Sequence, residues 1–227
     1  MTPEKHYAVA VDGPSGAGKS TLAKAIAEQL GILYVDTGAI YRTIGCAVQQ
    51  RGIKPRDEDA VRALLPELDI AMRYESDGEQ HMLLNGRDVT REIRLPEISM
   101  YASAVSALPA VRAYLLEMQR ELARRHSVIM DGRNIGTVVL PDAEVKIFLT
   151  ASAEVRAQRR CLELERRGTP KPYEEVLREL NERDYNDSHR AAAPLKAAPD
   201  AVIVDTSALN FDESREALLA LIRERVQ

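Results

Sequence analysis

A glycine-rich loop between an apolar strand and an amphipathic helix constrains this chain more than any other feature. The loop runs from Gly13 to Ser20 and fits the pattern of Gly, four free positions, Gly, Lys and then Ser or Thr. The apolar run Tyr7–Asp12 precedes it, and residues 19–30 follow with helical spacing until Gly31. This order of strand, loop and helix predicts the start of a parallel α/β fold.

The same loop predicts that the chain binds the phosphates of ATP or GTP. Its glycines let successive N–H groups point into one anion-sized hollow, at the positive end of a helix. Lys19 can reach the β- and γ-phosphates, and the Ser20 hydroxyl can ligate Mg²⁺. The residues predicted to bind ATP are Asp12, Gly13, Pro14, Ser15, Gly16, Ala17, Gly18, Lys19, Ser20 and Thr21. A glycine-rich turn that matches by chance is the alternative, and the strand and helix around it disfavour that alternative.

Composition narrows the class of protein. A chain of 227 residues with a net charge of −4 fits one medium domain and gives no electrostatic reason to expect nucleic acid. No apolar run is long enough for a signal peptide or a membrane span. Cys46 and Cys161 match no zinc-site spacing, so we expect reduced thiols. We therefore expect a cytoplasmic protein without a membrane or nucleic-acid partner.

Short apolar segments alternate with helices along the chain, which is typical of a parallel sheet covered on both faces. The expected strands are residues 7–12, 32–35, 127–131, 145–149 and 201–204. An apolar stripe after Pro109 predicts one helix, and Asn210 with Glu213 predicts the start of a final helix. The fold class is α/β, a three-layer sandwich with a five-stranded parallel sheet.

Two stretches interrupt this alternation. Residues 70–74 and 81–84, with turn residues at 76–78, predict an antiparallel hairpin in a small insert over residues 66–96. The core would then comprise residues 1–65 and 97–227. Residues 156–190 are rich in arginine and are broken by Gly and Pro, as expected of a helical lid over a phosphate site. A solvated pair of surface helices is the alternative.

The remaining residues favour a small kinase. The chain lacks the Asn-Lys-x-Asp motif of a GTPase, and a large mechanochemical ATPase would be longer. Arginines occur where an acceptor phosphate would need positive charge: Arg42 and Arg133 follow strands, and Arg183, Asp187 and Arg190 share one helical face. A surface salt bridge is the alternative for each arginine, above all for Arg183 with Asp187.

At this point the chain resembles the bacterial cytidylate kinases. The resemblance rests on the phrase from Asp12 to Ser20, DTGAIYR ending at Arg42, DGRNIGTVV starting at Asp131, and ERD at 182–184 with RAAAPL at 190–195. It runs from Val9 to the last helix. The resemblance implies transfer of phosphate from ATP to CMP or dCMP with Mg²⁺, by a protein with a core sheet, a lid and a monophosphate-binding insert. We expect a monomer, because each chain contains its full set of catalytic groups.

The resemblance also implies roles for single residues. Lys19, Arg133, Arg160 and Arg183 would act in catalysis, with Arg156 or Arg159 as other candidates in the lid. The residues that would bind the acceptor nucleotide are Thr37, Arg42, Ser103, Arg112, Asp131, Arg133, Asn134, Arg183, Asp187 and Arg190. Ser103 and Arg112 would meet the cytosine ring, and Asp187 the sugar hydroxyls. Ser20 would be the metal ligand.

Asn134 departs from the family pattern, which commonly has Asp at this position. An Asn amide can accept from the exocyclic amine of cytosine, but it can also rotate and donate to O4 of uracil. Two hypotheses follow: weaker discrimination of CMP from UMP, or an Asn that binds cytosine as Asp would.

Two other functions compete with this interpretation. The first is a kinase for another small acceptor, such as UMP, AMP, shikimate or dephospho-CoA. The second is a nucleotide-binding protein without turnover, against which the intact Lys19 and Ser20 argue.

Overall fold

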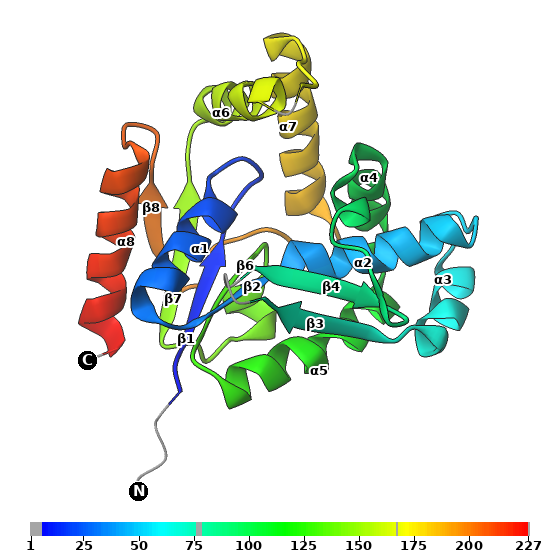
Figure 1. Cartoon of the computed structure of the whole chain (residues 1–227). Helices are drawn as coiled ribbons and strands as arrows, with labels where there is room; N and C mark the ends of the chain where they lie inside the picture. Colours follow the sequence, from blue (N-terminus) through cyan, green and yellow to red (C-terminus); the bar gives the residue numbers. More distant parts are fainter. Residues whose placement is uncertain (1–5, 76–78, 167, 227) are drawn as a thin grey trace, which may run out of the picture. The chain divides into compact units, whose positions relative to one another are not determined.

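A five-stranded sheet has the order β2-β6-β1-β7-β8 (Figure 1). The bounds of the strands are Ala8–Asp12 (β1), Leu33–Asp36 (β2), Val128–Gly132 (β6), Val145–Thr150 (β7) and Val202–Asp205 (β8). β1 pairs in parallel with β6 and β7, and β7 with β8. Every residue of β1 is buried, as a strand covered on both faces requires. The α/β class and its parallel sheet are confirmed, with each strand within one residue of its predicted ends.

The computed structural model describes residues 6–75, 79–166 and 168–226. Within it the chain forms two compact units. The first unit comprises residues 1–33 and 126–227, and the second comprises residues 34–125. The first unit carries the phosphate-binding loop, and the second carries the small antiparallel sheet.

The helices of the first unit are α1 (Lys19–Leu30), the single turn η3 (Ile135–Val139), α6 (Ala153–Arg166), α7 (Tyr173–His189) and α8 (Phe211–Val226). α1 and α8 pack against each other, and α8 also packs against β7. Gly31, at a φ of 65°, ends α1 as predicted. Asn210 and Glu213 exchange side-chain to backbone hydrogen bonds before α8, so the predicted capping box is confirmed.

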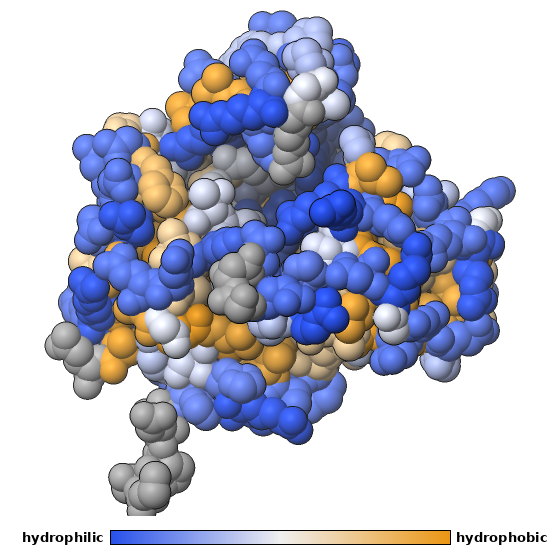
Figure 2. Space-filling model, viewed as in Figure 1, coloured by the Kyte–Doolittle hydropathy of each residue, from blue (hydrophilic) through white to orange (hydrophobic). Residues whose placement is uncertain are grey.

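The pair of helices α6 and α7 packs through a small apolar cluster of Ala157, Val176 and Leu180. Val176 is therefore directed inward, toward α6. The outer surface of this pair is largely hydrophilic in Figure 2. Gly168, at a φ of 71°, follows α6. Arg167, in the predicted hinge, lies outside the described residues.

The helices of the second unit are α2 (Thr37–Gln50), α3 (Glu58–Leu64), η1 (Leu65–Glu67), η2 (Glu92–Arg94), α4 (Pro96–Val105) and α5 (Pro109–Arg125). Its antiparallel sheet has the order β3-β4-β5, with bounds Ile70–Tyr74, Gln80–Leu84 and Arg87–Asp88. The predicted hairpin is thus confirmed, whereas its turn at 76–78 lies outside the described residues. The boundaries 66–96 for the insert stay a prediction.

α2 and α4 cross closely in the second unit. A Cβ on Gly45 would lie 2.8 Å from the backbone nitrogen of Ala102, so only glycine allows this approach. α5 buries Val111 and Leu115 as its apolar stripe predicted. Cys46 and Cys161 are free thiols. Among the described residues, none of the helices is long and apolar enough to cross a membrane.

Gly13 gives a testable requirement of the fold. Its φ is +148°, and a Cβ there would lie 1.9 Å from the carbonyl oxygen of Leu149 on β7. We expect Gly13→Ala to lower the free energy of unfolding by about 3 kcal/mol or more, measured by urea denaturation, because backbone atoms must move. Gly31→Ala is the control, since its Cβ would meet no atom within 4 Å, and it should cost about 1 kcal/mol. Equal losses in the two variants would contradict the steric argument.

Candidate active site

The phosphate-binding loop connects β1 to α1 through three glycines with positive φ. Gly13, Gly16 and Gly18 have φ values of 148°, 77° and 88°. Gly18 is also the N-cap of α1, so the loop ends directly on the positive end of that helix. A Cβ on Gly16 would lie 3.2 Å from the Cβ of Arg156, so α6 packs tightly against the loop. The local geometry is that of an anion-binding hollow.

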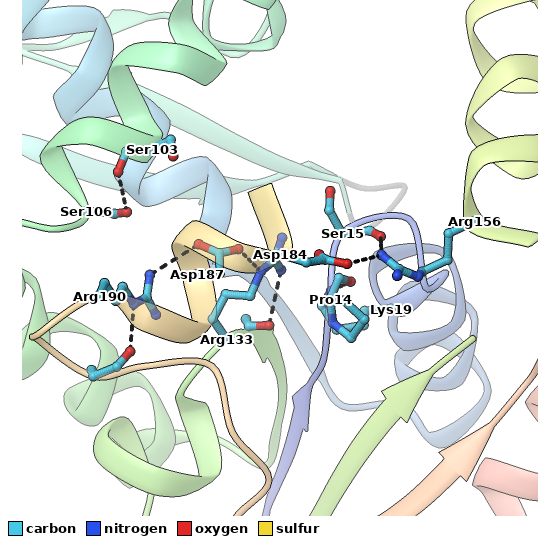
Figure 3. A network of polar contacts seen from close by, with 12 residues as sticks. Pro14, Ser15, Lys19, Ser103, Ser106, Arg133, Arg156, Asp184, Asp187 and Arg190 are labelled. Atoms are coloured by element: carbon cyan, nitrogen blue, oxygen red, sulfur yellow. Dashed lines mark hydrogen bonds and ion pairs between the residues drawn. The ribbon is translucent and has the colours of Figure 1, made fainter. Parts of the chain in front are cut away.

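Lys19 lies folded over this loop. Its side chain is buried, and Nζ donates to the carbonyl oxygen of Pro14 at 2.8 Å (Figure 3). Burial lowers the pKa of Lys19 to about 7, and the positive charges of Arg133 and Arg183 act in the same direction. A phosphate in the loop would favour the charged form, since it supplies the missing counter-charge. Lys19 is thus held where its positive charge would strongly stabilise a bound anion.

Ser20 and Asp131 form an oxygen-rich pair at the first turn of α1. The Ser20 hydroxyl donates to Oδ2 of Asp131 at 2.8 Å. A hydroxyl oxygen next to a carboxylate is the donor set that Mg²⁺ prefers in nucleotide sites. The residues present therefore fit the predicted metal. Groups of three or more His, Cys, Asp or Glu that could hold a metal by themselves are not found among the described residues.

The Asp12 carboxylate binds the backbone at the start of η3. Its two carboxylate oxygens accept from the N–H groups of Ile135 and Gly136 at 2.7 and 2.8 Å. Burial raises the pKa of Asp12, while these two hydrogen bonds and the charge of Lys19 oppose the rise. Asp12 thereby fixes η3, the turn that follows Arg133 and Asn134. Its predicted part in ATP binding stays a prediction.

The Asp187 carboxylate binds two of the predicted arginines. Arg133 Nε donates to Oδ2 at 2.8 Å, and Arg190 Nη1 lies 3.6 Å from Oδ1 (Figure 3). Arg190 Nε also donates to the carbonyl oxygen of Ala193, a residue whose φ is 50°. The RAAAPL segment therefore curls around this guanidinium. The resulting cluster brings together Arg133, which directly follows β6, with Asp187 and Arg190 at the end of α7.

Electrostatics show that this cluster is dominated by cations. Burial acts to raise the pKa of Asp187, but the charges of Arg133, Arg183 and Arg190 outweigh it and hold that pKa below its ordinary value. Arg183 therefore lies close enough to act on both Asp187 and Lys19. The ion pairs of Asp187 with Arg133 and Arg190 add to this effect.

The three arginines of α6 differ in what they bind. Arg156 is buried and donates to the carbonyl oxygen of Ser15 at 3.1 Å and to Asp184 at 2.6 Å (Figure 3). Arg159 donates to the side chain and backbone of Thr206. Arg160, whose side chain is 40% exposed, pairs with Glu163 on its own helix. Arg160 is thus more accessible than Arg156.

The second unit carries its own set of predicted residues. Arg42 Nη2 pairs with Oδ2 of Asp36 at 2.8 Å. The guanidinium of Arg112 lies 5.7 Å from the centre of the Tyr41 ring, a cation–π contact next in the chain to Arg42. Thr37 is buried at the start of α2, and Ser103 is exposed on α4, which packs on α2.

Sequence analysis missed several partners in these sets. Asp36 holds Arg42, Asp184 holds Arg156, and Gln80 in turn holds the backbone of Asp36. The turn η3 follows Asn134 and is bound by Asp12. The apolar run in residues 135–139 gave no helical signal, because isoleucine and valine favour strands. A short polar side chain at a strand end carries no information about which arginine it will meet.

Comparison with known proteins decides the family. A family model described as cytidylate kinase matches residues 9–224. The chain belongs to the cytidylate kinase family. Its relatives include the cytidylate kinase of Caldicellulosiruptor bescii, 48% identical over 223 residues that cover 98% of each chain. The cytidylate kinase of Carboxydothermus hydrogenoformans is also 48% identical, over 94% of this chain and 96% of the relative.

A solved structure gives an independent comparison of the fold of this cytidylate kinase family member. An uncharacterized protein from Eubacterium ventriosum matches with a TM-score of 0.55 and 13% sequence identity, over 97% of this chain and 100% of the other. At that identity the match shows a shared fold alone. The resemblance that the sequence motifs indicated is confirmed by the family model and the relatives.

The Asp187 cluster predicts a dependence of stability on pH. The pKa of Asp187 lies below its ordinary value of 3.8, so its ionised form stabilises the fold above that value. This contribution is lost as the pH falls through the folded-state pKa. We expect Asp187→Asn to lower the free energy of unfolding by about 2 kcal/mol at pH 7, with the difference from the wild type shrinking below about pH 4.

Urea denaturation at pH 7, 5 and 3 measures this difference. Asp142→Asn is the matched control, because Asp142 is exposed, and it should match the wild type throughout. A difference between Asp187→Asn and the wild type that is unchanged at pH 3 would show that the ion pairs do not cause it.

Proposed function

We propose that this chain transfers the γ-phosphate of ATP to CMP or dCMP, giving ADP and CDP or dCDP. The observation that carries the proposal is the phosphate-binding loop with its buried Lys19, in a chain that matches the cytidylate kinase family over residues 9–224. The acceptor follows from the family, whose relatives are named for this activity.

ATP would bind in the loop of the first unit. The backbone N–H groups of the loop between Gly13 and Ser20 would face its phosphates, and Lys19 would exchange its bond to Pro14 for phosphate oxygens. Ser20 and Asp131 would hold Mg²⁺, which when bound neutralises charge on the phosphates. Thr21, in the first turn of α1, would lie with this set.

CMP would be bound through its phosphate and its base. Arg42 and Arg133 each keep guanidinium N–H groups beyond their carboxylate bonds, and a planar fork matches a phosphate. Thr37, Ser103, Arg112, Asn134, Arg183, Asp187 and Arg190 would complete the acceptor contacts. Asp187 would accept from the sugar hydroxyls while its arginines turn to the phosphates.

The chemical step needs no strong general base. An oxygen of the CMP phosphate, already anionic, attacks the γ-phosphorus, and the bond from that phosphorus to the β,γ-bridging oxygen breaks, leaving ADP. Lys19, Arg133 and Arg183 would stabilise the charge on the transferring group, and Arg160 would assist from the lid. Closure of the helices α6 and α7 would exclude water, so that ATP is not hydrolysed.

The cellular compartment and the pathway follow from these substrates. Nucleotides and reduced thiols are typical of the cytoplasm, and the free Cys46 and Cys161 agree with that compartment. We propose a cytoplasmic enzyme of pyrimidine nucleotide metabolism that works as a monomer on small nucleotides.

A panel of acceptors tests the proposal. ADP release from ATP and Mg²⁺ is measured with CMP, dCMP, UMP, AMP and shikimate, and we expect turnover mainly with CMP and dCMP. Arg133→Ala should lower kcat/KM for CMP by about 100-fold or more, since a charge that stabilises the transferring group is lost. Arg62→Ala, on the exposed face of α3, is the control and should keep wild-type activity. ATP binding without turnover on any acceptor would overturn the proposal.

Asn134 gives a separate prediction about specificity. The residue is buried directly after Arg133, and its side-chain amide can donate as well as accept. We expect Asn134→Asp to raise the ratio of kcat/KM for CMP over UMP by about tenfold, because a carboxylate only accepts. A ratio that is already several hundred in the wild type would show that Asn134 binds cytosine as Asp would.

A further inference from the structure

Gln80 is a buried polar residue in the second unit for which the reaction has no evident use. It begins β4 of the small sheet and is 9% exposed. A buried amide is costly unless it is hydrogen-bonded, so its partners indicate why glutamine stands there. Its main partner, Asp36, lies outside the small sheet.

Both ends of the Gln80 amide bind the backbone of one residue, Asp36. Oε1 accepts from the Asp36 N–H at 2.8 Å, and Nε2 donates to the Asp36 carbonyl oxygen at 3.4 Å and to the Met82 sulfur at 3.1 Å. Only one orientation of the amide serves the N–H and the carbonyl together. Two contacts to a single residue fix both its position and its rotation.

Asp36 in turn holds Arg42. It is the N-cap of α2, where Oδ1 accepts from the Ala39 N–H at 2.8 Å. Its other oxygen, Oδ2, accepts from Arg42 Nη2 at the same distance of 2.8 Å. A Cβ on Gly38 would lie 3.0 Å from Asp36 Oδ1 and 3.1 Å from Arg42 Nη1, so the glycine leaves room for this pair.

The Arg42 guanidinium keeps donors for an anion. Among the described residues its Nε is buried without a hydrogen-bond partner. Tyr74 lies directly opposite Gln80 in the sheet, but its hydroxyl also has no partner there. Of these two residues, Gln80 is the one that hydrogen-bonds Asp36.

We infer that Gln80 is a positioning residue for the acceptor phosphate, acting from the small sheet through Asp36 on Arg42. The inference rests on the proposed function, because it takes Arg42 to bind the phosphate of CMP. A displacement of about 1 Å in such a group is enough to weaken binding and transfer. The small sheet then has a mechanical part in the site, besides any contact of its own with substrate.

Steady-state kinetics of Gln80→Met test the inference. Methionine keeps the size and shape of glutamine and removes both bonds to Asp36. We expect KM for CMP to rise about tenfold while KM for ATP stays within about twofold, since ATP binds elsewhere. An unchanged KM for CMP, or an equal rise for both substrates, would overturn the inference.

Gln119→Met is the matched control. Gln119 is a buried glutamine of the same unit, on α5, and its Oε1 has no hydrogen-bond partner among the described residues. We expect Gln119→Met to keep the wild-type KM for CMP and for ATP. This control therefore distinguishes the loss of the Asp36 contact from a general destabilisation of the second unit. If Gln80→Met does not fold, Gln80→Glu is the second test of the inference. Its carboxylate still accepts from the Asp36 N–H, but it cannot donate to the Asp36 carbonyl oxygen and is repelled by it. KM for CMP should again rise selectively.

Hydrogen exchange separates this inference from the proposed function. The Asp36 N–H should lose about tenfold or more of its protection in Gln80→Met and none in Gln119→Met. A wild type that does not phosphorylate CMP would refute the proposed function, whatever the exchange shows. A wild type that is active, with Asp36 exchange unchanged in Gln80→Met, would refute the positioning role alone.

Discussion

The pairing of arginine with carboxylate is the interaction on which the site depends. A protein that binds two polyanions must hold several cations near one another before either anion arrives, and like charges repel. Here the main cations are tied to acceptors in advance: Arg133 and Arg190 to Asp187, Arg156 to Asp184, and Arg42 to Asp36. Each carboxylate offsets charge and fixes the direction of a guanidinium. The arginines are therefore oriented without substrate, which is the form that electrostatic catalysis requires.

Backbone geometry determines the positions of the phosphate loop and of the chain around Arg133. Gly13 passes against the Leu149 carbonyl so closely that a side chain is excluded, which ties the phosphate loop to the neighbouring strand. The Asp12 carboxylate holds two N–H groups of η3 and so fixes the chain just after Arg133 and Asn134. Strands that are buried along their length make such positions rigid, because their packing leaves no room for a shift. Precision in the site thus comes from backbone packing and hydrogen bonds within the chain itself.

In the second unit, too, a carboxylate holds an arginine in place. Gln80 holds the backbone of Asp36, and Asp36 holds Arg42, so the small sheet reaches the arginine proposed to bind the acceptor phosphate through one amide. In both units a carboxylate binds an arginine that follows a strand: Asp187 of α7 binds Arg133, and Asp36 at the end of β2 binds Arg42. Lys19 differs, because its acceptor is the carbonyl oxygen of Pro14, and its burial brings its pKa near neutrality.

The sequence by itself determined the α/β class, the phosphate loop, the hairpin and the family, because each depends on local spacing. Buried strands appear as apolar runs, glycine positions mark the loop, and the motifs around Arg42 and Asp131 are contiguous. It also pointed to the candidate arginines, since strand ends line one edge of a parallel sheet. Tertiary structure alone decided which acid pairs with which arginine, that Asp187 binds Arg133 and Arg190, and that Gln80 reaches Asp36 across 44 residues of chain. The physical reason is that charge pairing and amide hydrogen bonds act over a few ångströms in space, and any polar residue that the fold brings near can supply them.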